Sequence, residues 1–227
     1  MRSVIVKGLK KVYPLGSTEV HALRGIDLEI EKGEFFVLAG PSGSGKSTLL
    51  NIIGCLDHAT EGRVWLEDME VSRCSDAELN RIRLHHIGFI FQSFNLISVL
   101  NVYENIELPL LIRKDIKPKE KRERVSELIE KVGLTDQINQ KPYELSGGQQ
   151  QRVAIARALV TSPKIVLADE PTANLDSRTG IEIIDLMHEM NRQRGTTFIF
   201  SSHDQKVIDR ASRVLHMADG MGRECAS

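Results

Sequence analysis

The chain has few cysteines, few aromatic residues and no long apolar run. Its three cysteines, Cys55, Cys74 and Cys225, stand far apart with no Cys-x-x-Cys spacing. A zinc site or disulfide framework is therefore not expected, and we interpret all three as free thiols of a reducing compartment. Apolar stretches such as FFVLAG and IVLA fall far short of the roughly 18 to 20 residues that cross a bilayer. The N-terminal MRSVIVKGLKK lacks the apolar core of a signal peptide, so we expect a soluble, cytoplasmic protein.

Neither sign of charge dominates the composition. Thirty basic and 31 acidic residues give a formal charge of −1 and a pI near 6.7. Broad electrostatic attraction to nucleic acid or anionic lipid is not expected from this balance, and we predict no nucleic-acid partner. We interpret the charged run KPKEKRER as a solvated helix face. A length of 227 residues suffices for one large domain, or for a core domain with a smaller subdomain.

Short β-rich runs alternate with longer helical ones, which is the pattern of an α/β fold. Antiparallel strands are predicted at 3–8, 20–30 and 62–66, and strands of a buried sheet at 34–39, 87–91, 164–168 and 196–201. Helices are predicted from Ser75, where Glu78 gives a capping-box spacing, and between Pro118 and Gly133. Two or more helices are thus inserted between strand 34–39 and strand 164–168, within one compact unit.

A glycine-rich loop follows the apolar run FFVLA and opens the predicted helix KSTLLNII. It fits the phosphate-loop pattern G-x-x-x-x-G-K-[ST] in the strand-loop-helix context that this pattern requires. Glycines allow a tight turn whose N–H groups face phosphate, and lysine adds a positive charge there. A hydroxyl after the lysine can bind the Mg²⁺ that bridges the phosphates. The phosphate-binding candidates are Gly40, Pro41, Ser42, Gly43, Ser44, Gly45, Lys46, Ser47 and Thr48, with Ser47 also a metal ligand.

Two acids and a histidine are predicted to share one edge of the sheet. KIVLADEPTANLD delivers Asp169 and Glu170 at the carboxyl end of a buried strand, where open α/β sheets bind ligands. Asp169 can bind Mg²⁺, and Glu170 can act as the general base that deprotonates the attacking water. The next strand, TTFIFSSHD, brings His203 to the same edge, within reach of the phosphate or the water.

A second phosphate cradle is predicted in YELSGGQQQRVAIARAL. Ser146, Gly147, Gly148 and Gln149 begin a helix and present a hydroxyl, free N–H groups and a positive helix end to an anion. One nucleotide in one chain cannot use both cradles. We therefore predict a head-to-tail homodimer in which the Ser146 cap of each chain closes over the ATP held by Lys46 of the other.

The segments LSGGQQQR, GPSGSGKST and VLADEPTANLD together closely resemble the nucleotide-binding domain of ATP-binding-cassette (ABC) proteins, over essentially the whole chain. The resemblance implies an ATPase with ATP and Mg²⁺ as cofactors. It implies one P-loop NTPase domain over 1–227, with a RecA-like core, an antiparallel β-subdomain and a helical subdomain at about 93–161. Tyr13 then stacks on adenine, Gln92 contacts Mg²⁺ or the water, and Asp176 meets the partner chain.

The runs IGFIFQSFNLISVLNVYENIELPLL and GCLDHATEGRVWL most resemble the ATPase subunits of the lipoprotein-releasing and macrolide-exporter group (LolD and MacB types). Such a subunit is peripheral on the cytoplasmic face of the inner or plasma membrane, attached through a permease. A P-loop metabolite kinase would leave Ser146 to Gln149 without a task. A transport subunit is favoured, and the alternative is an FtsE-like ATPase that transmits force to a membrane regulator without moving a solute.

The apolar stretch SFNLISVLNVYENIELPLL suggests where a permease docks. Exposed apolar patches commonly mark binding sites, and a short cytoplasmic helix would bind there in the helix-in-groove manner. We predict that Phe94, Leu96, Leu100 and Val102 line this pocket. The alternative is that these side chains form the core of the helical subdomain.

Overall fold

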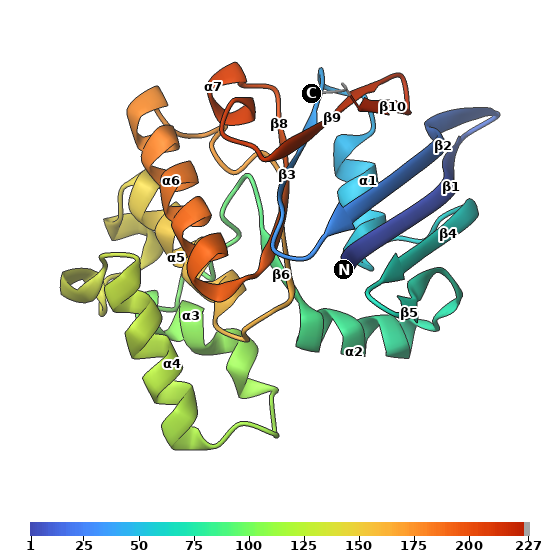
Figure 1. Ribbon diagram of the computed structural model, residues 1–227. Helices are drawn as coiled ribbons and strands as arrows, with labels where there is room; N and C mark the ends of the chain where they lie inside the picture. The colour runs from blue at the N-terminus through green and yellow to red at the C-terminus, as the bar shows by residue number, and fades with distance from the viewer. Residues whose placement is uncertain (225–227) are drawn as a thin grey trace.

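Two β-sheets organise the chain in the computed structural model, which describes residues 1–224 (Figure 1). The antiparallel sheet, in the order β2-β1-β4-β5, contains β1 (Arg2–Leu15), β2 (Thr18–Glu31), β4 (Glu61–Leu66) and β5 (Met69–Glu70). The larger sheet, in the order β10-β9-β3-β8-β7-β6, contains β3 (Phe35–Ala39), β6 (Ile87–Ile90), β7 (Ile165–Ala168), β8 (Thr197–Ser202), β9 (Arg213–Ala218) and β10 (Met221–Glu224). All neighbours in it pair in parallel except β10 with β9.

The predicted strands are confirmed, and the differences lie in length and number. Those expected at 3–8 and 20–30 are one long hairpin, β1 and β2, that continues to Leu15 and resumes at Thr18. Strands β5, β9 and β10 were not predicted. Strand β9 depends on pairing with β3, which is distant in sequence, and such pairing leaves little trace in a short segment. Strands β5 and β10 are short strands that pair with the strands just before them, β4 and β9.

Helices begin and end where local capping predicts. The Ser75 N–H donates to the Glu78 carboxylate over 2.8 Å at the start of α2, and Pro118 is the first residue of α4. Gly133, two residues beyond α4, has a φ of 71°, which favours glycine.

The α-helices are α1 (Lys46–Ile53), α2 (Asp76–His86), α3 (Val102–Leu111), α4 (Pro118–Lys131), α5 (Gly147–Leu159), α6 (Ser177–Arg194) and α7 (Gln205–Ile208). Three 3-10 turns are η1 (Val71–Arg73), η2 (Thr135–Gln137) and η3 (Pro142–Glu144). Within the described residues, no helix has the length and apolarity needed to span a membrane.

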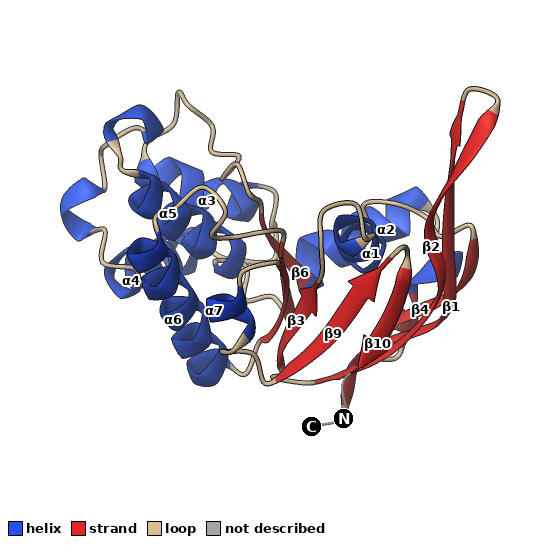
Figure 2. Ribbon diagram, turned by 90° about the horizontal axis from the view of Figure 1, so that it is seen from above, coloured by secondary structure: helices blue, strands red, loops and turns tan. Residues whose placement is uncertain are grey.

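The six-stranded sheet separates two apolar layers. Phe35 and Val37 of β3 pack into the cluster formed with α3, α4, α5 and α6. Phe36 and Leu38, which alternate with them, pack into the cluster formed with α1 and the antiparallel sheet. Successive strand residues point to opposite faces, so a run that is apolar throughout fits a strand covered on both sides. Figure 2 shows the same division, with α1 and the antiparallel sheet on one side and α3 to α6 on the other.

The register of the parallel strands determines where the candidate site lies. Ala39 at the end of β3 pairs with Ser202 of β8, and Ala168 at the end of β7 pairs with Phe200. The carboxyl ends of β3, β7 and β8 therefore lie at one edge of the sheet. The loops that leave them carry the glycine-rich loop, the acidic pair and His203, which places all three groups together.

Candidate active site

Close backbone approach fixes the glycines at the two ends of the glycine-rich loop. Gly40 has a φ of 154°, and a Cβ there would lie 2.2 Å from the Met217 carbonyl oxygen. Gly45 has a φ of 100°, and a Cβ there would lie 2.6 Å from the carbonyl oxygen of Ala22. Neither position can accept a side chain without moving the backbone. The loop is thus held between β2 and β9, and its last glycine leads directly into α1.

Lys46 folds back over this loop. Its side chain is 5% exposed, and its ammonium donates to the carbonyl oxygens of Gly40, over 2.7 Å, and Pro41, over 2.9 Å. The same nitrogen lies 3.7 Å from Glu170 Oε1. A positive charge therefore lies beside the loop's backbone, where the first N–H groups of α1 have no partner within the helix. This combination attracts an anion.

One buried hydroxyl organises the acidic pair. Ser201 Oγ donates to Asp169 Oδ1 over 2.6 Å and accepts from the Glu170 N–H over 2.9 Å. Ser47 Oγ donates to the same Asp169 oxygen over 3.0 Å, which joins the phosphate loop to β7. Sequence reasoning did not assign a role to Ser201. The sequence offers one signal for such a role: Ser201 is a polar residue at the end of the predicted strand 196–201, whose apolar residues indicate burial.

The Glu170 carboxylate lies between the Lys46 ammonium and the His203 imidazole. Glu170 Oε2 is 2.7 Å from His203 Nδ1, and Oε1 faces Lys46. Glu170 itself has a φ of 46°, a backbone conformation that is uncommon for residues other than glycine and often occurs at functional sites. In the neutral imidazole, a proton on Nδ1 shared with Glu170 leaves Nε2 as the free nitrogen.

These groups line one pocket of about 500 Å³. The structure brings together most of the residues that the sequence placed at a phosphate site: Ser42, Gly43, Gly45, Lys46, Ser47, Thr48, Gln92, Glu170 and His203. Asp169 reaches the pocket through its bond to Ser47. Sequence reasoning missed a further wall made by His21 and Arg24 of β2 and by the turn at Asp219 and Gly220. No signal for it exists in the sequence, because hairpin and turn approach the loop only in the folded chain.

Tyr13 lies at the margin of this site, and the pocket's lining does not include it. Its hydroxyl donates to Asp57 over 2.6 Å, and Lys11 Nζ lies 4.6 Å from the centre of its ring. Burial, followed by the bond to Asp57, raises the pKa of Tyr13. Its cross-strand partner Val20 does line the pocket, and directly paired residues share a sheet face.

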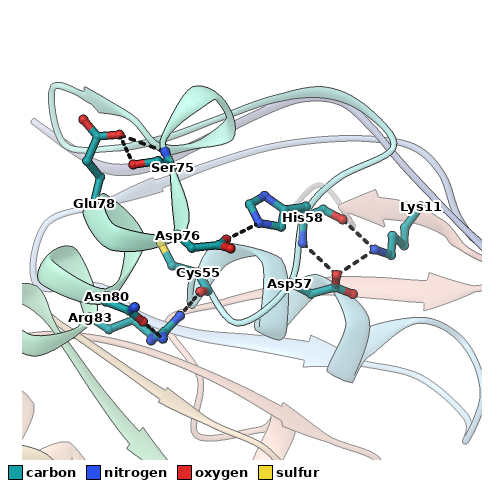
Figure 3. A network of polar contacts seen from close by, with 9 residues as sticks. All are labelled: Lys11, Cys55, Asp57, His58, Ser75, Asp76, Glu78, Asn80 and Arg83. Atoms are coloured by element: carbon teal, nitrogen blue, oxygen red, sulfur yellow. Dashed lines mark hydrogen bonds and ion pairs between the residues drawn. The ribbon is translucent and has the colours of Figure 1, made fainter.

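A polar network connects this margin with α2 (Figure 3). Lys11 Nζ lies 2.7 Å from both the Asp57 carboxylate and the carbonyl oxygen of His58, and His58 Nε2 lies 3.0 Å from Asp76 Oδ1 at the start of α2. The loop after α1 is thereby attached both to β1 and to α2.

The second predicted cradle lies elsewhere in the chain. Ser146 Oγ accepts from the Gln149 N–H over 3.3 Å, so it caps α5 as the sequence predicts. Asp176 caps α6 by accepting from the N–H groups of Arg178 and Thr179, and the hydrogen bond from Thr179 lowers its pKa. Neither Asp176 nor the segment 146–149 lines the pocket of Lys46. Helices α5 and α1 lie on opposite sides of the six-stranded sheet (Figures 1 and 2).

The segment proposed for docking divides into buried and exposed residues. Val102 is 1% exposed and belongs to the core, and Leu96 packs against that core. For Val102 the core alternative is therefore correct. A separate groove of about 350 Å³ is lined by other residues, among them Phe91, Ile97 and Leu108.

Comparison with known proteins decides the family. The model of the family described as ABC transporter matches residues 23–173. The chain belongs to the ABC transporter family. It is an ABC transporter ATP-binding protein, an ATPase that hydrolyses ATP to ADP and phosphate.

Relatives of this ABC protein carry several names. It is 48% identical over 210 residues to an uncharacterized ABC transporter ATP-binding protein of Thermotoga maritima, covering 92% of this chain and 89% of that one. It is 45% identical to the lipoprotein-releasing system ATP-binding protein LolD of Alcanivorax borkumensis, covering 96% and 95%. It is 46% identical to the macrolide export protein MacB of Bdellovibrio bacteriovorus, covering 95% of this chain and 33% of that longer protein.

Solved structures confirm the fold class of this ABC protein. The ATP-binding cassette MJ0796 of Methanocaldococcus jannaschii, in a dimeric post-hydrolysis state bound to ADP and phosphate, superposes with a TM-score of 0.89. The two chains are 44% identical, and the superposition covers 99% of each. The predicted P-loop NTPase core with an antiparallel subdomain is confirmed.

Proposed function

We propose that this ATP-binding subunit powers an ABC transporter of the export or lipoprotein-release type, peripheral on the cytoplasmic face of the membrane and attached through a permease. The identities of 45% with LolD and 46% with MacB support this reading. We also propose that residues 1–227 form one nucleotide-binding domain whose helical part, about 93–161, moves as a subdomain. Helices α3, α4 and α5 pack against one another, which supports their moving together.

In the proposed site the glycine-rich loop and Lys46 bind the nucleotide's phosphates. Mg²⁺ binds hard oxygen ligands and usually relies on few protein groups plus phosphate and water. Ser47 Oγ and Asp169 Oδ1 lie 3.0 Å apart, and Gln92 lines the same pocket. Among residues 1–224 no group of three or more His, Cys, Asp and Glu side chains is placed to hold a metal. The oxygens of Ser47, Gln92 and Asp169 fit such an ion and would hold it together with phosphate oxygens, and the ion would neutralise phosphate charge.

We assign the proton transfer to Glu170. Its carboxylate lies in the pocket beside Lys46 and His203, so it can accept the proton of a water that attacks the terminal phosphate. His203, oriented through Nδ1 by Glu170, presents Nε2 toward that phosphate or the water. Tyr13 offers the ring face not covered by Lys11 for stacking on adenine, a contact of about 1 to 3 kcal/mol by analogy with base stacking.

One observation carries the proposed dimer: two anion-attracting helix ends occupy opposite sides of one sheet. The start of α1 lines the pocket of Lys46, and the start of α5 at Ser146 does not. In a head-to-tail dimer the Ser146 cap of one chain closes over the ATP at the other chain's Lys46, and Asp176 meets the partner. The dimeric state of the relative MJ0796 bound to ADP and phosphate supports the formation of a dimer.

Mixing two inactive variants tests the shared site. Lys46→Ala removes the charge beside the phosphates, and Ser146→Arg blocks the second cradle. In a mixed dimer one site carries both changes and the other carries none. We expect roughly a quarter of normal ATPase activity in an equimolar mixture, because about half the dimers are mixed and each retains one intact site.

The control is each variant alone, which should hydrolyse ATP at background rate. Native mass spectrometry on chains of distinguishable mass measures the fraction of mixed dimers. If mixed dimers form in ATP and no activity returns, the proposed one-site rescue is wrong.

A further inference from the structure

Arg157 of α5 binds the backbone of a loop far from it in sequence. Its guanidinium donates to the carbonyl oxygen of Asn95 over 2.6 Å and to that of Phe94 over 2.7 Å. No carboxylate is among its partners in the described part of the chain, and burial lowers its pKa. Here the guanidinium exchanges hydration for two neutral carbonyl oxygens.

The bound carbonyls belong to an unfavourable stretch of backbone. Phe94 has a φ of 62° and Asn95 a φ of 49°, so two consecutive residues other than glycine are left-handed. Such conformations persist where the surroundings enforce them. The Arg157 fork is placed to do so, because its two N–H groups have fixed geometry and bind both carbonyls at once.

The other side of this loop reaches the active site. Gln92 lines the pocket of Lys46, and its carbonyl oxygen accepts from Asn174 Nδ2 over 2.9 Å. Asn174 lies between Glu170 and Asp176. Residues 92–95 are therefore bonded on one side to the loop that carries the proposed base, and on the other to the helix that begins at the Ser146 cap.

We propose that Arg157 is a positioning residue that fixes the loop 92–95 to α5, so that occupancy of the pocket at Gln92 is transmitted to the Ser146 end of that helix. The proposal rests on the roles proposed above for Gln92 and Ser146. Arg157 does not line the nucleotide pocket, so its substitution removes no group from the lining of that pocket. Binding both carbonyl oxygens at once requires the planar guanidinium fork of Arg157, and a positive charge alone does not suffice.

Arg157→Lys tests this directly, because lysine keeps the charge and loses the fork. Arg152→Lys is a matched control: Arg152 is on the same helix and its NH1 donates to the Val132 carbonyl oxygen over 3.1 Å, outside the loop. We expect Arg157→Lys to bind ATP within about twofold of the unaltered protein and to lose about ten- to a hundredfold in kcat, since small misplacements of catalytic geometry cost this much. Arg152→Lys should change neither.

Hydrogen exchange measured by mass spectrometry on amides 92–97 and 146–150 supplies a readout that general destabilisation does not mimic. In the unaltered chain, ATP should slow exchange in both segments. In Arg157→Lys we expect ATP to slow exchange at 92–97 less, and at 146–150 not at all, with thermal unfolding close to that of Arg152→Lys. The proposal is overturned if Arg157→Lys keeps kcat within twofold, or if ATP still protects 146–150 as in the unaltered chain.

A further variant distinguishes an error in the role proposed for Arg157 from an error in the role proposed for Gln92. Gln92→Ala removes the side chain in the pocket and leaves the Arg157 contacts intact. If Gln92→Ala hydrolyses ATP normally while Arg157→Lys does not, the role proposed for Gln92 is wrong and coupling through its side chain is rejected. If both lose hydrolysis and only Arg157→Lys increases exchange at 93–97 without nucleotide, the positioning role is confirmed.

Discussion

Ser201 Oγ donates a hydrogen bond to Asp169 Oδ1 over 2.6 Å, across the boundary between two parallel strands. Because the same hydroxyl accepts from the Glu170 N–H, one buried serine sets the positions of both acids. An acid that must meet a metal or a water benefits from a fixed rotamer, and here the rotamer is fixed from the neighbouring strand.

Ser201→Ala should therefore affect stability and activity together. Loss of the hydroxyl leaves the Glu170 N–H without its partner, at a cost of about 1 to 3 kcal/mol in the free energy of unfolding. We expect kcat to fall by about tenfold or more as Asp169 loses its orientation. Thr197→Val is the control: that buried hydroxyl, at the other end of β8, accepts from the Gly33 N–H over 3.0 Å. It should lower stability comparably in urea denaturation and leave kcat unchanged; equal losses of kcat in both variants would contradict the prediction.

Glu170→Gln should separate nucleotide binding from hydrolysis. Glutamine cannot accept the proton, so we expect hydrolysis to fall by about 10² to 10⁴-fold, while ATP still binds through Lys46. The variant should accumulate as a dimer with ATP and Mg²⁺, measured by size-exclusion chromatography. Glu182→Gln, an exposed carboxylate of α6, should behave as the unaltered chain. A Glu170→Gln protein that stays monomeric and hydrolyses ATP at the normal rate would refute the assignment.

Substitution by glutamate should leave folding intact at Val99 and prevent folding at Val102. Val99 is 71% exposed in the apolar segment predicted to bind the permease, and Val102 is 1% exposed. Val99→Glu should change the free energy of unfolding by no more than about 0.5 kcal/mol and keep basal ATPase activity, yet abolish stimulation by the permease in proteoliposomes. Val102→Glu should prevent folding, because it buries an unpaired charge. Normal stimulation in the Val99 variant would place the docking surface elsewhere.

Cys55 should resist alkylation in the folded chain. Burial raises the pKa of its thiol to about 12, with Cys74 adding a smaller effect. An ordinary thiol titrates near 8.5, so at pH 8 the reactive thiolate of Cys55 is roughly a thousandfold scarcer. Labelling with iodoacetamide should rise about tenfold per pH unit above pH 9, and become rapid at pH 8 in urea. The thiol of the unfolded chain ionises first, so the free energy of unfolding falls as pH rises from about 8.5 toward the folded pKa of about 12. Rapid labelling of the folded chain at pH 8, read by peptide mass spectrometry, would contradict this.

The sequence by itself determined the parts of the site that are continuous in the chain. Gly40 to Thr48 adopt their loop because strand, glycines and helix follow one another directly, and Ser146 caps α5 through a residue three positions away. Asp169 and Glu170 are delivered by a strand whose apolar run marks it as buried. Each of these depends on local conformational preferences and on burial of a periodic pattern, which the order of residues records.

Tertiary structure alone decided which distant residues complete the site. Ser201 reaches Asp169 because β7 and β8 pair in parallel, and His21 and Asp219 reach the pocket because the β1–β2 hairpin and the β9–β10 turn close against the glycine-rich loop. Arg157 meets Phe94 across 63 residues, and Val102 enters the core while Val99 remains exposed. These contacts arise from strand register and helix packing, whose free energy depends on the whole chain and leaves no signal within any short segment.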